Sequence, residues 1–369
     1  MPKRDRSIIV NQDALLDGAY PEISLDHLER LTDRTGIIQH AIYSIPNRRT
    51  GYCTDDNARA LIVAACHHNT TGSRQALRMV STYLSFVHYA QIPNGKFHNF
   101  MSFDQVFLDG EGSEDCQGRT LWALGQCLAA DIHDNVKEVA RNLLRQALWI
   151  PLEVSHNRAR GYSAVGLALA FEGQADDQIA EVLKTVADNL CDDFERNATE
   201  EWDWFEPFLT YSNSLMPRAL FLAYEKLGDR RYLQIAERSW KFLRKNCIID
   251  DMLQIIGCNG WYFKGRERAW FDQQPIDAMM MCVAALDAYR ITQDQSYLRD
   301  AQLCLEWFFG RNALNVSLHD PVTGGCFDGL SATGRNGNQG AESTISCLLT
   351  QIEMAPYIKN GMSLFIDMQ

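Results

Sequence analysis

Residues 274–288 read QPIDAMMMCVAALDA, and this stretch decides the fold. Asp277 stands at its polar start, and residues 278–286 are small or apolar on every side. A helix that is apolar all round has to be buried between neighbours, and an acid is typical of a first helical turn. The stretch therefore predicts a buried helix that opens on a polar N-terminus.

The same pattern recurs five more times along the chain. A polar segment with a carboxylate, an amide or a tyrosine runs into a helix of small and apolar residues at 54–59 (TDDNAR), 113–119 (SEDCQGR), 160–164 (RGYSA), 211–216 (YSNSLM) and 339–344 (QGAEST). The six starts are 48 to 65 residues apart, about one helical hairpin with its loops, when they are anchored on Asp56, Asp115, Ser163, Asn213, Asp277 and Glu342. Between them, one-sided amphipathic helices are predicted around residues 74–89, 134–149, 177–194, 231–245 and 297–309.

A buried inner ring wrapped by an amphipathic outer ring is an all-α architecture, the (α/α)6 barrel. We expect it to occupy residues 25–369 as a single domain, after a lead-in segment at residues 1–24. Its six polar starts should gather at one mouth of the barrel. Any one of these acids is explained equally well as a helix cap. All six together favour a polar ligand, because concentrating acids and amides there is otherwise costly.

Composition narrows the class of partner. The formal charge of −12 argues against nucleic acid and against an anionic membrane. No window approaches ~18 uninterrupted apolar residues, so neither a signal peptide nor a membrane span is predicted. The 11 cysteines show no metal-ligand spacing, and no nucleotide-binding fingerprint appears. We therefore expect a cytoplasmic, reduced protein with no metal and no cofactor.

Two aromatic loops carry the most specific chemistry. Residues 201–207 read EWDWFEP, and residues 259–263 (NGWYF) and 270–274 (WFDQQ) precede the fifth start. Sugars pack their apolar CH faces on aromatic rings, and their hydroxyl edges pair with carboxylates, amides and guanidinium groups. The loops predict a carbohydrate cleft at the mouth. The alternative is that rings such as Trp204 and Phe205 only plug the end of the barrel.

Four segments resemble a bacterial family in the six-hairpin glycosidase superfamily: residues 51–61 (GYCTDDNARAL), 204–206 (WFE), 271–278 (FDQQPIDA) and 338–343 (NQGAES). Members of that family occur alone or fused behind glycosyltransferase domains, and many carry a glycosyltransferase label for that reason. The resemblance extends over nearly the whole chain from about Pro21. It implies the (α/α)6 fold, a carbohydrate substrate and acid/base chemistry by two carboxylates, and it makes a glycosyltransferase a candidate partner. The chain has no Rossmann-type glycosyltransferase domain, so a transferase label would be inherited from fusion partners.

Glycoside cleavage needs one protonated carboxyl and one carboxylate. Glu206 is the expected acid, because the rings of Trp204 and Phe205 beside it should favour its neutral form. Asp277 or Asp56 is the expected base, since a helix N-terminus stabilises a carboxylate. Asp115 and Glu342 are the next candidates. The residues expected to bind sugar rings and hydroxyls are Asp55, Arg59, Arg119, Tyr162, Trp202, Asp203, Trp204, Tyr211, Asn213, Trp261, Trp270, Asp272, Gln273, Gln274 and Gln339.

Three functions remain open at this point. The first is a glycoside hydrolase, inverting as is common in such barrels, that acts on a mannose- or glucose-type oligosaccharide. The second is a sugar epimerase of the related barrel type, which would use histidines as bases. Only His40, His98 and His319 qualify, and none lies in the six starts. The third is a non-catalytic carbohydrate-binding module that serves a separate glycosyltransferase.

Overall fold

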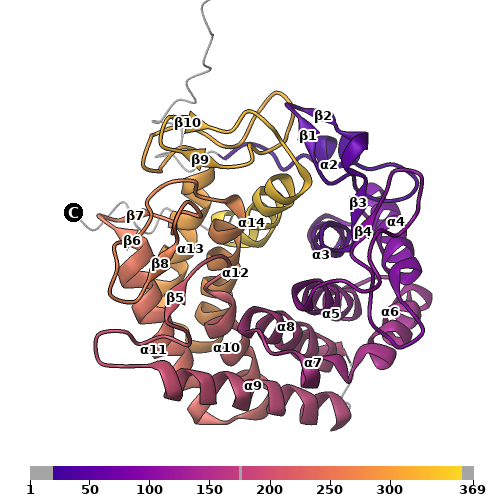
Figure 1. Ribbon diagram of the computed structural model, residues 1–369. Helices are drawn as coiled ribbons and strands as arrows, with labels where there is room; N and C mark the ends of the chain where they lie inside the picture. Colours follow the sequence, from indigo (N-terminus) through magenta and orange to yellow (C-terminus); the bar gives the residue numbers. More distant parts are fainter. Residues whose placement is uncertain (1–19, 174–176, 360–369) are drawn as a thin grey trace, which may run out of the picture.

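The computed structural model describes residues 20–173 and 177–359, and these form an (α/α)6 barrel (Figure 1). Six buried helices surround the barrel axis, each beginning at or near one of the polar starts. They are α3 (Thr54–Thr71), α5 (Glu114–Ala129), α8 (Asn157–Gly173), α10 (Leu215–Leu227), α12 (Pro275–Thr292) and α14 (Ala341–Lys359). The predicted inner ring is confirmed.

An outer layer of amphipathic helices wraps this ring (Figure 1). Its long members match the five predicted segments: α4 (Arg74–Ala90), α6 (Asp134–Ala147), α9 (Asp177–Asn197), α11 (Arg230–Cys247) and α13 (Gln295–Phe308). The short α2 (Asp26–Leu31) packs against α14 on the remaining side, and α7 (Ile150–Glu153) lies in the loop before α8. Most of the expected lead-in segment lies outside the described residues, so the division of the chain stays a prediction.

Glycine allows two inner helices to approach closely. A Cβ atom on Gly125 of α5 would lie 2.0 Å from the carbonyl oxygen of Gly166 on α8, so no larger residue fits without displacing the backbone. Five cysteines lie on inner helices, and the other six lie on outer helices or in the loops. All eleven cysteines are free thiols and ten are buried, where they act as small apolar side chains.

The two ends of the barrel differ in loop length. Inner helices pass to outer helices through very short turns, such as Gly72–Ser73 and Gly228–Asp229, in which both glycines adopt positive φ. Outer helices return to inner helices through long loops, and these contain every described strand and the 3-10 helix Arg48–Thr50. The antiparallel pairs are β1 (Ala41–Ile42) with β2 (Ile45–Pro46), β3 (Tyr52–Cys53) with β4 (Phe100–Met101), β5 (Phe208–Leu209) with β8 (Tyr262–Phe263), β6 (Ile248–Ile249) with β7 (Met252–Leu253) and β9 (Leu330–Ser331) with β10 (Gly334–Arg335). The long loops surround the N-termini of the inner helices, which is where a site is expected.

No helix in the described part of the chain is long and apolar enough to span a bilayer.

Candidate active site at the barrel mouth

An arginine on the first inner helix joins two carboxylates at the mouth. Arg59 of α3 donates to Oδ1 of Asp56 and to Oε2 of Glu342 on α14, both at 2.6 Å. The side chains of Arg59 and Asp56 are 4% exposed, whereas that of Glu342 is 41% exposed. Partial burial raises the pKa of Glu342, but the charges of Arg59 and Arg119 outweigh it and the pKa is lowered overall. Burial raises the pKa of Asp56 although Arg59 opposes the change.

A second arginine serves the next pair of acids. Arg119 of α5 contacts Asp55 at 3.1 Å and Asp115 at 3.3 Å, and its guanidinium lies 5.1 Å from the centre of the Tyr162 ring. Asp115 also accepts a hydrogen bond of 2.7 Å from the hydroxyl of Tyr211. Tyr211 belongs to the loop before α10, so this bond ties that loop to the N-terminus of α5.

A third arginine, Arg158, was not among the residues expected from the sequence. It donates to Glu206 at 2.8 Å, to the carbonyl oxygen of Tyr211 at 2.6 Å and to Oδ1 of Asn213 at 3.2 Å. The sequence pattern predicts a polar start at Arg160, but α8 begins at Asn157, about one turn earlier. Arg158 therefore lies before the predicted start. The segment HNR at residues 156–158 is the signal that would have identified it.

Asp277 has an environment opposite to the one expected. Its Oδ1 accepts the backbone N–H of Ser212 at 2.6 Å, whereas its buried Oδ2 has no hydrogen-bond partner in the described part of the chain. The carboxyl adjoins a small cavity of about 20 Å³ with apolar walls that include Ile256 and Met281. Burial raises the pKa of Asp277 to about 8, which the Ser212 N–H and the charge of Arg158 only partly counteract. Desolvation of the Asp277 carboxyl thus opposes the ionised form that the helix N-terminus was expected to stabilise.

The surroundings of Glu206 also differ from those expected for a catalytic acid flanked by aromatic rings. Trp204 and Phe205 are completely buried and pack against outer-layer rings, so they are plugs rather than sugar platforms. The carboxylate of Glu206 instead forms an ion pair with Arg158 at 2.8 Å. Trp202 is buried too, and its indole N–H donates to the carbonyl oxygen of Glu206 at 2.7 Å. The first aromatic loop is therefore structural, as the alternative interpretation held.

Other expected binding residues separate into two groups. Asp203 is drawn outward by Arg238 of α11 at 2.6 Å, and Gln273 and Gln339 are buried in contacts with Trp307 and with Asp320 and Thr323. The hydroxyl of Ser163 returns to its own helix at Ala159. These side chains hold the loops in place and do not face a ligand.

The second aromatic loop keeps rings at the surface. The ion pairs and hydrogen bonds of Arg59, Arg119 and Arg158 described above form the mouth network. Trp261 is half-buried and its ring lies 6.4 Å from that of Tyr211, which places it beside this network. Trp270 is exposed and is covered on one face by Arg268 at 4.2 Å. Asp272 and Gln274 are half-buried in the turns that lead into α12. Of the expected tryptophans, Trp261 is the one that lies beside Tyr211.

The three histidines considered as bases for an epimerase lie in different surroundings. His40 is exposed and close enough to Glu342 for its charge to contribute to the lowered pKa of that carboxyl. His98 stacks on Phe107 with ring centres 4.3 Å apart, and His319 is buried against Phe309. Of these three, His40 is the one whose charge acts on Glu342. No group of three or more His, Cys, Asp or Glu side chains suited to a metal ion occurs among the residues described.

Comparison with protein-family models gives no match, and comparison with curated proteins gives none either. Solved structures do match over most of the chain. A sugar epimerase from a ruminal bacterium superposes with a TM-score of 0.70 at 13% identity, covering 92% of this chain and 97% of its own. A D-mannose isomerase superposes with a TM-score of 0.69 at 13% identity, covering 92% of this chain and 100% of its own.

A third similar structure is a hydrolase. It is an inactive variant of an α-1,6-mannanase, GH76A of Salegentibacter sp. HEL1_6, in complex with α-1,6-mannotetrose. Its TM-score is 0.62 at 13% identity, and the match covers 90% of this chain and 96% of that one. The chain thus shares the fold of these three structures, the (α/α)6 barrel that the sequence predicted.

Proposed function

We propose that the chain is a glycoside hydrolase that cleaves a mannose- or glucose-type oligosaccharide at the barrel mouth. The observation that carries the proposal is a pair of carboxyls whose environments separate their protonation states. The pKa of Asp277 is raised to about 8, the pKa of Glu342 is lowered, and the charge of Glu342 itself contributes to the shift at Asp277. These shifts would leave Asp277 protonated and Glu342 charged at neutral pH.

These states match the two roles in glycoside hydrolysis. Asp277 would donate its proton to the leaving glycosidic oxygen, which requires that substrate binding bring its buried Oδ2 into contact with that oxygen. Glu342 would activate a water molecule at the anomeric carbon. Glu342 is the most exposed acid of the mouth network, as contact with water requires. Asp55, Asp115 and Arg119 would bind hydroxyls, with Trp261 against a sugar face. We expect inversion at the anomeric carbon.

The mannanase comparison supplies a second acid pair to test. The inactive variant lacks two consecutive aspartates, and this chain has the consecutive pair Asp55 and Asp56 at the start of α3. Asp56 is nearly buried and bound to Arg59, while Asp55 shares Arg119 with Asp115. This pair is the alternative if Asp277 and Glu342 prove dispensable.

A sugar epimerase or isomerase is the second candidate function. It is supported by the placement of His40 beside Glu342 and by the epimerase and isomerase among the similar structures. Epimerisation at a carbon next to a carbonyl removes a proton from carbon, and hydrolysis does not. Solvent exchange at that carbon therefore separates the two reactions.

The test is an incubation in D2O followed by NMR. The substrates are mannose, glucose, and manno- and cello-oligosaccharides of two to six units. New reducing ends without deuterium on carbon would support hydrolysis, and the first anomer to appear reports inversion or retention. Deuterium at C2 with a second isomer would replace the hydrolase proposal by epimerisation. Binding without either reaction would favour the non-catalytic module that serves a glycosyltransferase.

A further inference from the structure

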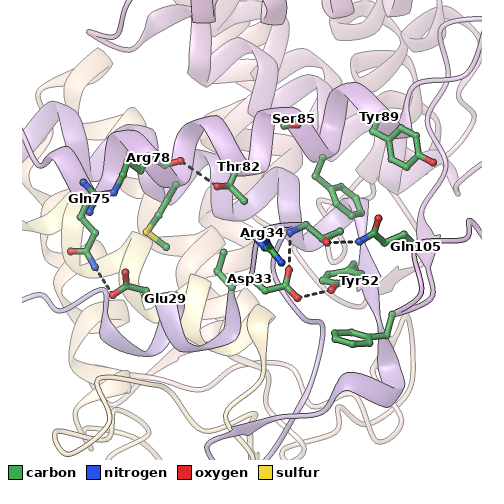
Figure 2. A pocket seen from close by; sticks show the side chains of 15 residues that line it. Glu29, Asp33, Arg34, Tyr52, Gln75, Arg78, Thr82, Ser85, Tyr89 and Gln105 are labelled. Atoms are coloured by element: carbon green, nitrogen blue, oxygen red, sulfur yellow. Dashed lines mark hydrogen bonds between the residues drawn. The ribbon is translucent and has the colours of Figure 1, made fainter.

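A groove lies on the outside of the barrel, lined by residues other than those of the mouth network. It encloses about 1060 Å³ between α2, the loop that follows it, α4 and the loop around Phe103 (Figure 2). Small-molecule pockets typically enclose ~300–1,000 Å³, so this groove has room for an extended ligand. None of its lining residues takes part in the mouth network.

Aromatic rings form part of the groove wall. Phe103 stacks on Tyr52 with an interplanar angle of 14°, and the hydroxyl of Tyr52 is fixed by a 2.7 Å hydrogen bond to Asp33. Phe103 remains 41% exposed and Tyr89, at one end of the groove, 61% exposed. The exposed Arg48 is the other neighbour of the Phe103 ring, at 5.4 Å. The groove thus offers two partly exposed rings, one of which has a fixed orientation.

The carboxylates of the groove are already engaged. Oδ1 of Asp33 accepts the backbone N–H groups of Thr35 and Gly36, and its Oδ2 accepts from Tyr52. Glu29 accepts from the amide of Gln75 at 2.8 Å, a contact visible at the left end of the groove in Figure 2. These bonds hold the acceptors of the groove in fixed positions.

The arginines of the groove are free. Across the described ranges, neither Arg34 nor Arg78 forms an ion pair, although both line the groove (Figure 2). The chain has 47 acidic and 35 basic residues, so a shortage of acids does not explain this. Arg34 and Arg78 therefore present guanidinium donors that a ligand can use in bidentate fashion.

We propose that this groove is an accessory site for a neutral oligosaccharide, separate from the mouth. Two free guanidinium groups, two engaged carboxylates, amides and hydroxyls provide the donors and acceptors that vicinal sugar hydroxyls require, and the rings of Phe103 and Tyr89 suit the CH faces. The two acids and two arginines that line the groove balance in charge, which disfavours a polyanion, although Arg48 adds one positive charge beside Phe103. The choice of a carbohydrate rests in part on the proposed function, but binding here is independent of catalysis.

The groove is linked to the mouth through one strand. Tyr52 lies in β3, which pairs with β4 and runs directly into the first turn of α3, where Asp55 and Asp56 begin the mouth network. A chain held in the groove would therefore be tethered on the same side of the barrel as the α3 start. The groove should therefore increase the affinity for long oligosaccharides and leave the affinity for short ones unchanged.

The test measures affinity by isothermal titration with manno- and cello-oligosaccharides of two to six units. The groove variants are Arg34→Ala, Phe103→Ala and Tyr89→Ala, all at exposed positions where folding should be retained. Matched controls are Arg145→Ala and Leu152→Ala, an exposed arginine without an ion pair in the described chain and an exposed apolar residue, both far from the groove in sequence. Arg119→Ala tests whether the ligand binds at the mouth. We expect each groove variant to weaken binding of the six-unit ligand about tenfold, with the controls unchanged.

The outcomes separate this proposal from the proposed function. Loss of long-chain affinity in the groove variants, with two-unit binding unchanged, supports the accessory site. Loss only in Arg119→Ala overturns the accessory site and leaves the mouth proposal intact. Binding of a sulfated oligosaccharide but of no neutral one overturns the assigned ligand class, and no binding of any glycan overturns both proposals.

Discussion

The guanidinium of Arg59 lies 2.6 Å from Oε2 of Glu342, a contact between residues 283 positions apart in the sequence. It joins the first and the last inner helix of the ring, α3 and α14. The same guanidinium binds Asp56 at 2.6 Å, so one side chain bridges the two ends of the ring and pairs with two carboxylates of the mouth. Removing one partner of a buried ion pair leaves the other charge uncompensated, which is costly.

We expect Arg59→Met to lower the free energy of unfolding by ~3 kcal/mol, because Asp56 stays buried without its counter-charge. The control is Arg196→Met, whose side chain is 69% exposed and pairs with Asp193 on the surface, with an expected change below ~1 kcal/mol. Urea denaturation at pH 7 measures both. Equal changes in the two variants would contradict a buried, structural pair.

The pH dependence of stability should report Asp277. Its pKa is 3.8 in the unfolded reference and about 8 in the folded chain, so between these values the unfolded chain releases a proton that the folded chain keeps. This contribution to stability is complete below pH ~4 and is lost as pH rises to about 8, by at most ~1.4 kcal/mol per pH unit. Asp277→Asn lacks this slope, so its stability relative to wild type should increase from pH 5 to pH 8. A difference that is constant across that range, measured by urea denaturation, would show that Asp277 is not protonated in the fold.

Much of the fold follows from the sequence because inner and outer helices have different periodicities. Residues 278–286 are apolar on all sides and become buried α12, while α4, α6, α9, α11 and α13 follow the one-sided segments closely. The start of α8 was missed by one turn, since the residues 157–159 are polar or small and carry no apolar periodicity. That error concealed Arg158.

The site was harder to predict, for two physical reasons. An aromatic ring on a loop serves equally well as a plug or as a sugar platform, and only tertiary packing decides that Trp204 is the first kind. The protonation of Asp277 depends on the balance of desolvation against the helix terminus and the Ser212 N–H, and burial is not visible in the sequence. Pairings such as Arg59 with Glu342 are long-range and likewise leave no local signal.

The two aromatic loops should respond differently to mutation. Trp204→Ala removes a completely buried ring and should cost ~3–5 kcal/mol of stability, without testing ligand contact. Trp261→Ala removes a half-buried ring beside Tyr211 and should weaken oligosaccharide binding with a small change in stability. Trp149→Ala, an exposed tryptophan of the outer surface, is the control for both readouts. Thermal unfolding and isothermal titration measure the set, and unchanged affinity in Trp261→Ala would remove that ring from the site.

The catalytic roles are tested by replacing each carboxyl of the protein with its amide and measuring kcat and KM. The substrate is the one found by the NMR screen. Glu342→Gln and Asp277→Asn should each lower kcat by ~10²-fold or more with little change in KM, because each removes a proton-transfer group and keeps the shape of the side chain. Glu206→Gln should act mainly on KM, since Glu206 pairs with Arg158, and Arg158 in turn binds the carbonyl oxygen of Tyr211 in the loop before α10. Glu111→Gln, at an exposed ion pair with Lys96, is the control.

The pH profile of kcat/KM distinguishes catalysis from mere structural damage. Wild type should lose activity above about pH 8 as Asp277 deprotonates, and in acid as Glu342, with its lowered pKa, becomes protonated. The alkaline limb should disappear from the residual activity of Asp277→Asn and remain in that of Glu342→Gln. Near wild-type kcat in both variants would refute this pair and direct the test to Asp55, Asp56 and Asp115. Loss of kcat in Glu206→Gln alone would restore the acid first inferred from the sequence, with Arg158 then required to release it when substrate binds.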